Sequence, residues 1–207
     1  FKSPLARGMA RLAFRGAAFI SVRDPESHRR VREDLGLSTK VVLSFDPVFS
    51  LFEARKSDHR SQDVLIVVPR LNSEEAFDDA VRSARKEGTP TRILSFQPDE
   101  PAEHAVCDRL RGIVPEAGVV AVRSMDDAVS ALSDARLVVT HRYHGGIAAL
   151  GLGIPVKIVR QAAGDKLDLL AVAAEDPSAL EEFRGRIALG EEAFRRALGG
   201  LKEGSRS

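Results

Sequence analysis

The sequence has few of the residues that mark a disulfide-stabilised, nucleic-acid-binding or membrane-spanning protein. It contains one cysteine, Cys107, and no tryptophan, and its net charge is only +1. A single cysteine excludes an intramolecular disulfide, and nucleic-acid binders usually show a basic excess that is missing here. No apolar run reaches the ~20 residues that a membrane-spanning helix needs. We therefore expect an ordinary globular protein with no nucleic-acid partner, in which Cys107 is a small core residue.

Short motifs with known chemistry are also missing from the sequence. It has no CxxC, no HExxH, no GxxxxGK[ST] and no GxGxxG. These motifs supply metal ligands or a backbone cradle for phosphates. No motif in the sequence therefore predicts a metal site or a nucleoside-triphosphate site. We expect neither a bound metal nor a bound cofactor.

From Asp63 onward, strand-like and helix-like stretches alternate. Apolar runs that predict strands lie at residues 63–70, 91–97, 118–124, 135–141 and 154–160. The first of them, DVLIVVPR, is the kind of run that is buried on both faces of a parallel sheet. Five strands with helices between them predict right-handed crossovers. The predicted fold class is therefore α/β, with a Rossmann-like parallel sheet of about five strands flanked by helices.

The first 60 residues follow a different rhythm. Their expected elements are a basic helix, a strand, a helix and a second strand, at residues 6–15, 18–24, 25–36 and 40–45. This segment is too small to be a domain of its own. We expect residues 1–60 to be the end of an N-terminal α/β domain plus a linker, with the beginning of that domain upstream. Residues 61–207 are expected to form the C-terminal domain, with terminal helices that pack back.

The most informative stretch for function is THRYHGGIAALGLGIPV, from Thr140 to Val156. It follows the fourth predicted strand of the sheet and opens a helix, and ligands of open parallel sheets bind at that edge. The first N–H groups of a helix favour an anion, and Gly145 and Gly146 would let it approach the backbone closely. Arg142 offers a planar fork suited to phosphate or carboxylate, and His144 can transfer a proton near neutral pH.

A plain strand-to-helix turn is the alternative interpretation, with His144 as a cap and Arg142 in solvent. The strand-end position and the combination of residue types favour a small phosphorylated or carboxylated ligand. Because side chains alternate along a strand, Arg142 and His144 are expected to share a face that His141 and Tyr143 do not. This parity holds only if the strand continues through these residues.

Other polar residues follow predicted strands. Arg23 is either a ligand contact or half of a surface ion pair, whereas Asp24, directly before a proline, is typical of a helix N-cap. Asp46, also followed by proline, favours a turn. Lys166 follows the fifth strand and, taken alone, would be a solvated lysine.

At these residues the sequence resembles the polysaccharide pyruvyl transferase family. The matching motifs are S-V-R-D-P-E-S, F-D-P-V-F and R-Y-H-G-G-I-A-A-L-G-L-G-I-P-V, at residues 21–27, 45–49 and 142–156. Their order and spacing also match, and the arginine-x-histidine element followed by G-x-P is the most specific piece. The resemblance covers essentially the whole chain, as the C-terminal two-thirds of a family member. It implies a two-domain fold like that of GT-B glycosyltransferases, with the active site between the domains.

The resemblance also implies roles for individual residues. Arg142 and His144 would bind the donor, with Tyr143 contributing through its backbone and His144 suited to catalysis. Arg23 resembles the family's arginine from the N-terminal side of the cleft. Lys166 resembles the lysine that often follows the fifth strand, but here the preceding residues read RQAAGD instead of the family's aromatic-Asp context.

The implied reaction moves the pyruvyl group of phosphoenolpyruvate onto a sugar as a ketal and releases phosphate. A histidine suits the proton transfers, and two arginines suit the phosphate and the carboxylate. Phosphoenolpyruvate is then a donor substrate, and the acceptor is expected to be a sugar of a cell-wall or cell-surface polysaccharide precursor, often lipid-linked. By family analogy we expect a cytoplasmic enzyme that works at the inner membrane face.

Two other functions stay open. A GT-B-type nucleotide-sugar glycosyltransferase also carries H-G-G near a strand end, but it commonly has an acidic residue in the following helix to hold the donor ribose. Here that helix reads GGIAALGLG and has no carboxylate, which favours phosphoenolpyruvate. A non-catalytic phosphosugar-binding relative is the second alternative, and the presence of Arg142 and His144 argues against it.

Overall fold

The computed structural model describes residues 3–37, 41–44, 46–56, 62–72, 75–160 and 166–204. The chain forms two compact units, one of Phe1–Pro47 with Ser178–Ser207 and one of Val48–Pro177. The expected division at residue 60 lies outside the described residues. No helix in the described part of the chain has the length and apolar character required to cross a membrane.

The first unit contains a small parallel sheet. Its strands are β1 (Ile20–Val22) and β2 (Val41–Leu43), which pair along their whole length. α1 (Pro4–Arg15) precedes the sheet, and α2 (Pro25–Glu33) connects the two strands. The expectation for Asp24 is confirmed, because Asp24 is the N-cap of α2 and its carboxylate accepts a hydrogen bond of 2.7 Å from the backbone N–H of Ser27.

The last helix, α9 (Pro177–Gly204), joins this unit from far along the chain. The Ser44 hydroxyl donates to the Arg186 carbonyl oxygen over 3.2 Å, and the ring centroids of Phe19 and Phe194 are 5.8 Å apart. Residues at opposite ends of the sequence therefore stabilise the same small unit.

The second unit is built on one five-stranded sheet. The strands are β3 (Val64–Val68), β4 (Thr91–Ser95), β5 (Gly118–Ala121), β6 (Ala135–Thr140) and β7 (Val156–Ile158). They are all parallel and lie in the order β5-β4-β3-β6-β7. The first strand is central, the next two lie on one side and the last two on the other, as in a Rossmann-like sheet. The predicted fold class is confirmed.

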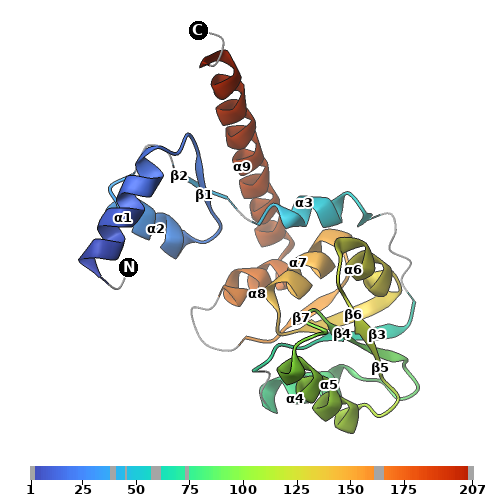
Figure 1. Ribbon diagram of the computed structural model, residues 1–207. Helices are drawn as coiled ribbons and strands as arrows, with labels where there is room; N and C mark the ends of the chain where they lie inside the picture. Colours follow the sequence, from blue (N-terminus) through green and yellow to red (C-terminus); the bar gives the residue numbers. More distant parts are fainter. Residues whose placement is uncertain are drawn as a thin grey trace. The chain divides into compact units, whose positions relative to one another are not determined.

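Helices cover both faces of this sheet (Figure 1). On one face lie α4 (Glu75–Ala84) and α5 (Pro101–Ile113), and on the other lie α6 (Met125–Leu132), α7 (Tyr143–Leu152) and α8 (Leu167–Glu175). The short helix α3 (Val48–Glu53) packs against α7. Gly151 makes that contact close, since an added Cβ would lie 2.7 Å from the Cβ of Phe52.

The core explains why the central strand is apolar throughout. All five residues of β3 are buried, as expected for a strand covered on both faces. Side chains of β3 that face α4 and α5 pack with residues such as Phe77, Ile93 and Leu110. Burying one such aliphatic or aromatic side chain stabilises the fold by about 1.5–3 kcal/mol. The register pairs Val68 with Thr140, so β3 and β6 end at the same level.

The core also sets the reactivity of the single cysteine. Cys107 on α5 is 3% exposed, and burial raises the pKa of its thiol. Because the thiolate is the reactive form, we expect iodoacetamide at pH 8 to alkylate the native protein more than about tenfold more slowly than the urea-unfolded chain. Equal alkylation rates, followed by mass spectrometry, would contradict the burial of Cys107.

Candidate functional site

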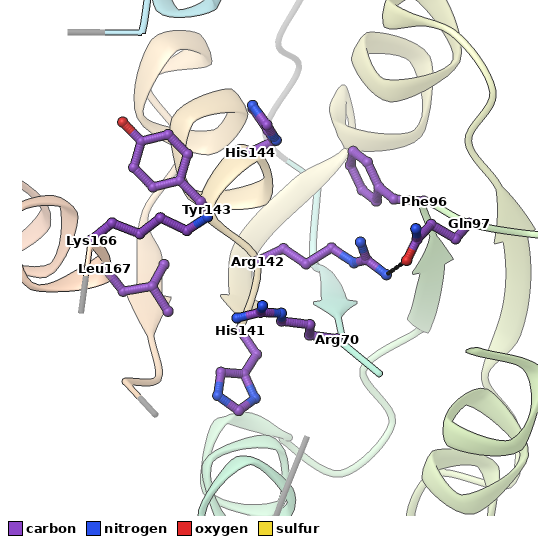
Figure 2. Close-up of a pocket in the computed structure, with 9 residues that line it drawn as sticks. All are labelled: Arg70, Phe96, Gln97, His141, Arg142, Tyr143, His144, Lys166 and Leu167. Atoms are coloured by element: carbon purple, nitrogen blue, oxygen red, sulfur yellow. Dashed lines mark hydrogen bonds between the residues drawn. The ribbon is translucent and has the colours of Figure 1, made fainter. Parts of the chain in front are cut away.

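A pocket of about 250 Å³ opens at the carboxyl edge of the five-stranded sheet. It lies beside the neighbouring ends of β3 and β6, whose following helices leave toward opposite faces, and such a switch point is the usual ligand site of an open α/β sheet. The pocket is lined by Arg70, Phe96, Gln97, His141, Arg142, Tyr143, His144, Lys166 and Leu167 (Figure 2). The sequence motif that follows the fourth strand of this sheet therefore does form a pocket.

The chain turns from strand to helix earlier than the sequence analysis expected. β6 ends at Thr140, and α7 starts at Tyr143 with Arg142 as its N-cap. The predicted parity, in which only Arg142 and His144 share a face, is wrong because the strand does not continue through them. All four residues from His141 to His144 line the pocket.

The Thr140 hydroxyl fixes this turn. It accepts a hydrogen bond of 3.0 Å from the Arg142 N–H and lies 3.1 Å from the Arg142 carbonyl oxygen. The first bond of α7 runs from the Gly146 N–H to that carbonyl. The N–H groups that come before Gly146 in the first turn have no acceptor within the helix. The side chain of the N-cap residue Arg142 does not cap them either. A helix start of this kind favours an anion.

The Arg142 side chain is held in place from several elements. Its Nε donates to the Pro69 carbonyl oxygen over 2.7 Å, and its Nη2 donates to Gln97 Oε1 over 3.2 Å and to the carboxylate of Glu103. The side chain is only 16% exposed. The alternative in which Arg142 is simply solvated is therefore wrong.

Burial, together with the charge of Arg70, lowers the pKa of Arg142 to about 10. The adjacent Glu103 carboxylate opposes this shift, since an opposite charge favours the protonated guanidinium. Arg142 is therefore a cation at neutral pH, held beside a second cation.

Sequence reasoning missed the pocket residues Arg70, Phe96, Gln97 and Leu167, and also Glu103, which pairs with Arg142. Arg70 follows the buried strand β3 and was included in the predicted strand, although its place after the first strand of the sheet was a usable signal. Glu103 lies in the first turn of α5, where an acidic residue is ordinary. Nothing in the sequence distinguishes it from such a residue, yet its side chain is 0% exposed.

The ring of Tyr143 forms part of the pocket wall. Tyr143 is buried, the exposed His144 meets it edge-on with 5.6 Å between ring centroids, and the Lys166 Nζ lies 5.4 Å from its centroid. Lys166, although in a sequence context unlike the family's, is therefore at the same pocket as Arg142. Residues 161–165, which precede it, lie outside the described part of the chain.

The glycines of the motif have a packing role. A Cβ on Gly145 would lie 2.6 Å from Thr140 Oγ1 and 3.0 Å from Val68 Cγ1. A Cβ on Gly146 would lie 3.2 Å from Leu170 Cδ1. Neither glycine lines the pocket. Their small size lets α7 pack closely on its neighbours, and the close ligand approach that we expected of these two residues stays a prediction.

His141 packs into the core of the second unit, and Arg23 belongs to the other unit. His141 is 3% exposed and stacks on Phe77, with 5.4 Å between ring centroids. Arg23 belongs to the first unit, where its Nη1 lies 3.4 Å from Asp46 Oδ2 at the carboxyl ends of β1 and β2. The expectation that Arg23 reaches the donor stays a prediction.

The charge of the pocket has one sign. Arg70, Arg142 and Lys166 line it, whereas none of its lining residues in the described part of the chain is acidic. The Glu103 carboxylate, which does not line the pocket, pairs with Arg142. Over the described residues, no group of three or more His, Cys, Asp and Glu side chains is suited to a metal ion. The charges that line the pocket therefore suit a small anion.

The family model for polysaccharide pyruvyl transferases matches residues 1–159 of this chain. The chain belongs to the polysaccharide pyruvyl transferase family. This confirms the resemblance drawn from the three sequence motifs. All pocket residues of this family member except Lys166 and Leu167 lie inside the matched region.

Solved structures with a similar chain trace are distant in sequence from this pyruvyl transferase family member. One is accessory secretory protein 1, 2 and 3 of Streptococcus pneumoniae, with 14% identity and a TM-score of 0.47 over 95% of this chain and 45% of that one. Another is Anabaena Alr3699/HepE in complex with UDP and glucose, with 15% identity and a TM-score of 0.47 over 99% of this chain and 67% of that one. The chain thus spans under half of the first protein's length. A search of curated proteins gave no match.

The packing role of Gly145 gives a testable prediction. We expect Gly145→Ala to lower the free energy of unfolding by about 1–3 kcal/mol, because the new methyl group must displace Thr140 or Val68. Gly112→Ala on α5 is the control, since its Cβ would meet nothing within 4 Å and the exposed helix should gain about 0.5–1 kcal/mol. Urea titrations of both variants measure the difference, and equal stability of the two would refute the packing role.

Proposed function

We propose that this chain carries the donor site of an enzyme that transfers the pyruvyl group of phosphoenolpyruvate to a sugar as a ketal. The observation that carries this proposal is a cationic pocket at a helix start, lined by Arg70, Arg142 and Lys166. Phosphoenolpyruvate has a phosphate and a carboxylate on a short carbon frame. Two anionic groups so close together need several cationic partners, and arginine forks suit both.

The size of the pocket and the composition of α7 support a small donor. A volume of about 250 Å³ lies below the roughly 300–1,000 Å³ that is usual for drug-sized ligands. α7 contains no acidic residue that could hold a ribose. Both features favour phosphoenolpyruvate over a nucleotide sugar.

The proposed reaction begins with protonation of the methylene carbon of phosphoenolpyruvate, which makes the neighbouring carbon electrophilic. A sugar hydroxyl attacks that carbon and loses its proton, and the carbon–oxygen bond to phosphate breaks. A second hydroxyl of the same sugar then closes the ketal and releases its proton. Atoms and charge balance without an oxidant or reductant, so we propose no cofactor.

Four residues that line the pocket have a place in this scheme. Arg142, Arg70, Lys166 and the first N–H groups of α7 would hold the anionic groups and compensate the charge of the departing phosphate. His144, exposed at the pocket, would transfer a proton. We further propose that Arg23 contacts the donor from the first unit, and that the acceptor is a lipid-linked glycan precursor met at the cytoplasmic face of the membrane.

Donor choice is tested by isothermal titration calorimetry on the full-length protein. We expect phosphoenolpyruvate to bind and UDP-glucose to bind at least about tenfold more weakly, since the pocket lacks a carboxylate for the ribose. Tight binding of UDP-glucose without binding of phosphoenolpyruvate would favour a glycosyltransferase instead.

His144→Gln tests the proton transfer. With an acceptor selected from a panel of glycans, we expect kcat for phosphate release to fall by about 10²–10⁴-fold while the melting temperature stays near that of the wild type. His104→Gln is the matched control, because His104 is an exposed histidine on α5 that does not line this pocket. A lower melting temperature with unchanged turnover of the folded fraction would make His144 structural.

A further inference from the structure

Glu103 is a buried carboxylate close to the pocket. Its side chain is 0% exposed, although it belongs to the first turn of α5, where most acidic residues stay in water. Removing a carboxylate from water costs several kcal/mol unless it is paired and hydrogen-bonded. An apolar residue would serve packing at this position equally well, so the charge itself needs an explanation.

The contacts of Glu103 hold its carboxylate in a single orientation. Oε1 accepts hydrogen bonds of 2.9 Å from the Ser95 hydroxyl and of 2.9 Å from the Gln97 backbone N–H. Oε2 meets Nη2 of Arg142. Because the end of β4 fixes one oxygen, the other oxygen is presented to the arginine in a defined direction.

Arg142 is fixed on one side of its planar guanidinium only. Its Nε is bound to Pro69, and its Nη2 is bound to Gln97 and Glu103 (Figure 2 shows the Gln97 contact). Over the described residues, no hydrogen bond of Nη1 to the protein is present, and Arg142 lines the pocket. The guanidinium of Arg142 is thus held through Nε and Nη2, and Nη1 can donate a hydrogen bond to a ligand.

Arg70 makes this anchoring necessary. It lines the same pocket, and its positive charge contributes to lowering the pKa of Arg142. Two guanidinium groups that line one pocket repel each other, and this repulsion would turn Arg142 away if no other group held it. A fixed carboxylate behind Arg142 offsets that repulsion.

We propose that Glu103 is a positioning residue that holds Arg142 in its donor-binding orientation beside Arg70. This inference rests on the proposed function, because phosphoenolpyruvate is the anion that the two arginines would share. Glu103 acts only through Arg142 and does not itself contact the donor. A merely structural Glu103 would instead support the fold and leave the donor affinity of folded protein unchanged.

Glu103→Gln is the most direct test in the full-length protein. The amide oxygen keeps the contacts to Ser95 and Gln97, but the amide NH₂ faces the Arg142 fork and repels it. We expect the Kd for phosphoenolpyruvate to rise about ten- to a hundredfold. Asp134→Asn is the matched control: it breaks the pair in which Arg92 donates to Asp134 over 3.2 Å, away from the pocket, and should change the Kd by less than about twofold. Unchanged affinity in Glu103→Gln would overturn the proposal.

A double-mutant cycle shows whether Glu103 acts through Arg142. In an Arg142→Met background, we expect Glu103→Gln to weaken donor binding no further and to raise the melting temperature, because it removes an unpaired buried charge. Additive losses of affinity would mean that Glu103 acts by another route. Ser95→Ala is a milder variant in case Glu103→Gln folds poorly, and it should shift the Kd in the same direction by a smaller factor.

The orientation of Arg142 can also be followed without a donor. In a protein with ¹⁵N-labelled arginine, the Nε–H of Arg142 should exchange slowly with solvent in the wild type and faster in Glu103→Gln, with Asp134→Asn unchanged. Equal exchange in all three proteins would overturn the positioning role. If the wild type fails to bind phosphoenolpyruvate, the proposed donor is wrong, and this exchange measurement still decides whether Glu103 positions Arg142.

Discussion

The site depends on one interaction, the contact between the Arg142 guanidinium and the buried Glu103 carboxylate. Through Arg142 it ties the end of β6 to the end of β3, since Nε binds the Pro69 carbonyl, and through Glu103 it ties both to the end of β4. Three strands are thereby locked at one edge of the sheet. A pair that is buried in this way is costly to form and costly to break, so its geometry is well defined. The cationic pocket takes its shape from that rigidity.

The sheet places this pair where a ligand can use it. β3 and β6 are neighbours in space but far apart in sequence, and the helices that follow them cover opposite faces. The chain therefore leaves an opening at their carboxyl ends, and Tyr143 and His144 at the start of α7 line it. Close packing of α7 on the sheet, which Gly145 and Gly146 permit, sets how near that helix start and its N-cap residue Arg142 lie to the end of β3. Packing and electrostatics thus act on the same few residues.

Much of the fold could be predicted from the sequence, because long apolar runs in alternation with helical stretches allow few arrangements. The sequence also predicted that the motif after β6 belongs to a functional site, since Arg142 and His144 are unusual at a strand end. The geometry of the motif could not be predicted, because the strand ends two residues before Arg142 and no local signal marks that point. The role of Glu103 could not be predicted for a different reason. Its burial and its contact with Arg142 arise only when α5 packs on β4 and the sheet brings the residues after β4 and β6 to the same edge, and a single sequence does not record long-range pairs. Arg23 keeps its predicted role only as a proposal, since it lies in the other unit.

The central claim is that the pocket between the ends of β3 and β6 binds the donor. A crystal structure of the full-length protein soaked with phosphoenolpyruvate tests it most directly. The account predicts that the phosphate and carboxylate groups contact Arg142 Nη1, Arg70 and the first N–H groups of α7, with His144 beside the methylene carbon. Phosphoenolpyruvate bound elsewhere, with Arg142 still facing an empty pocket, would contradict it.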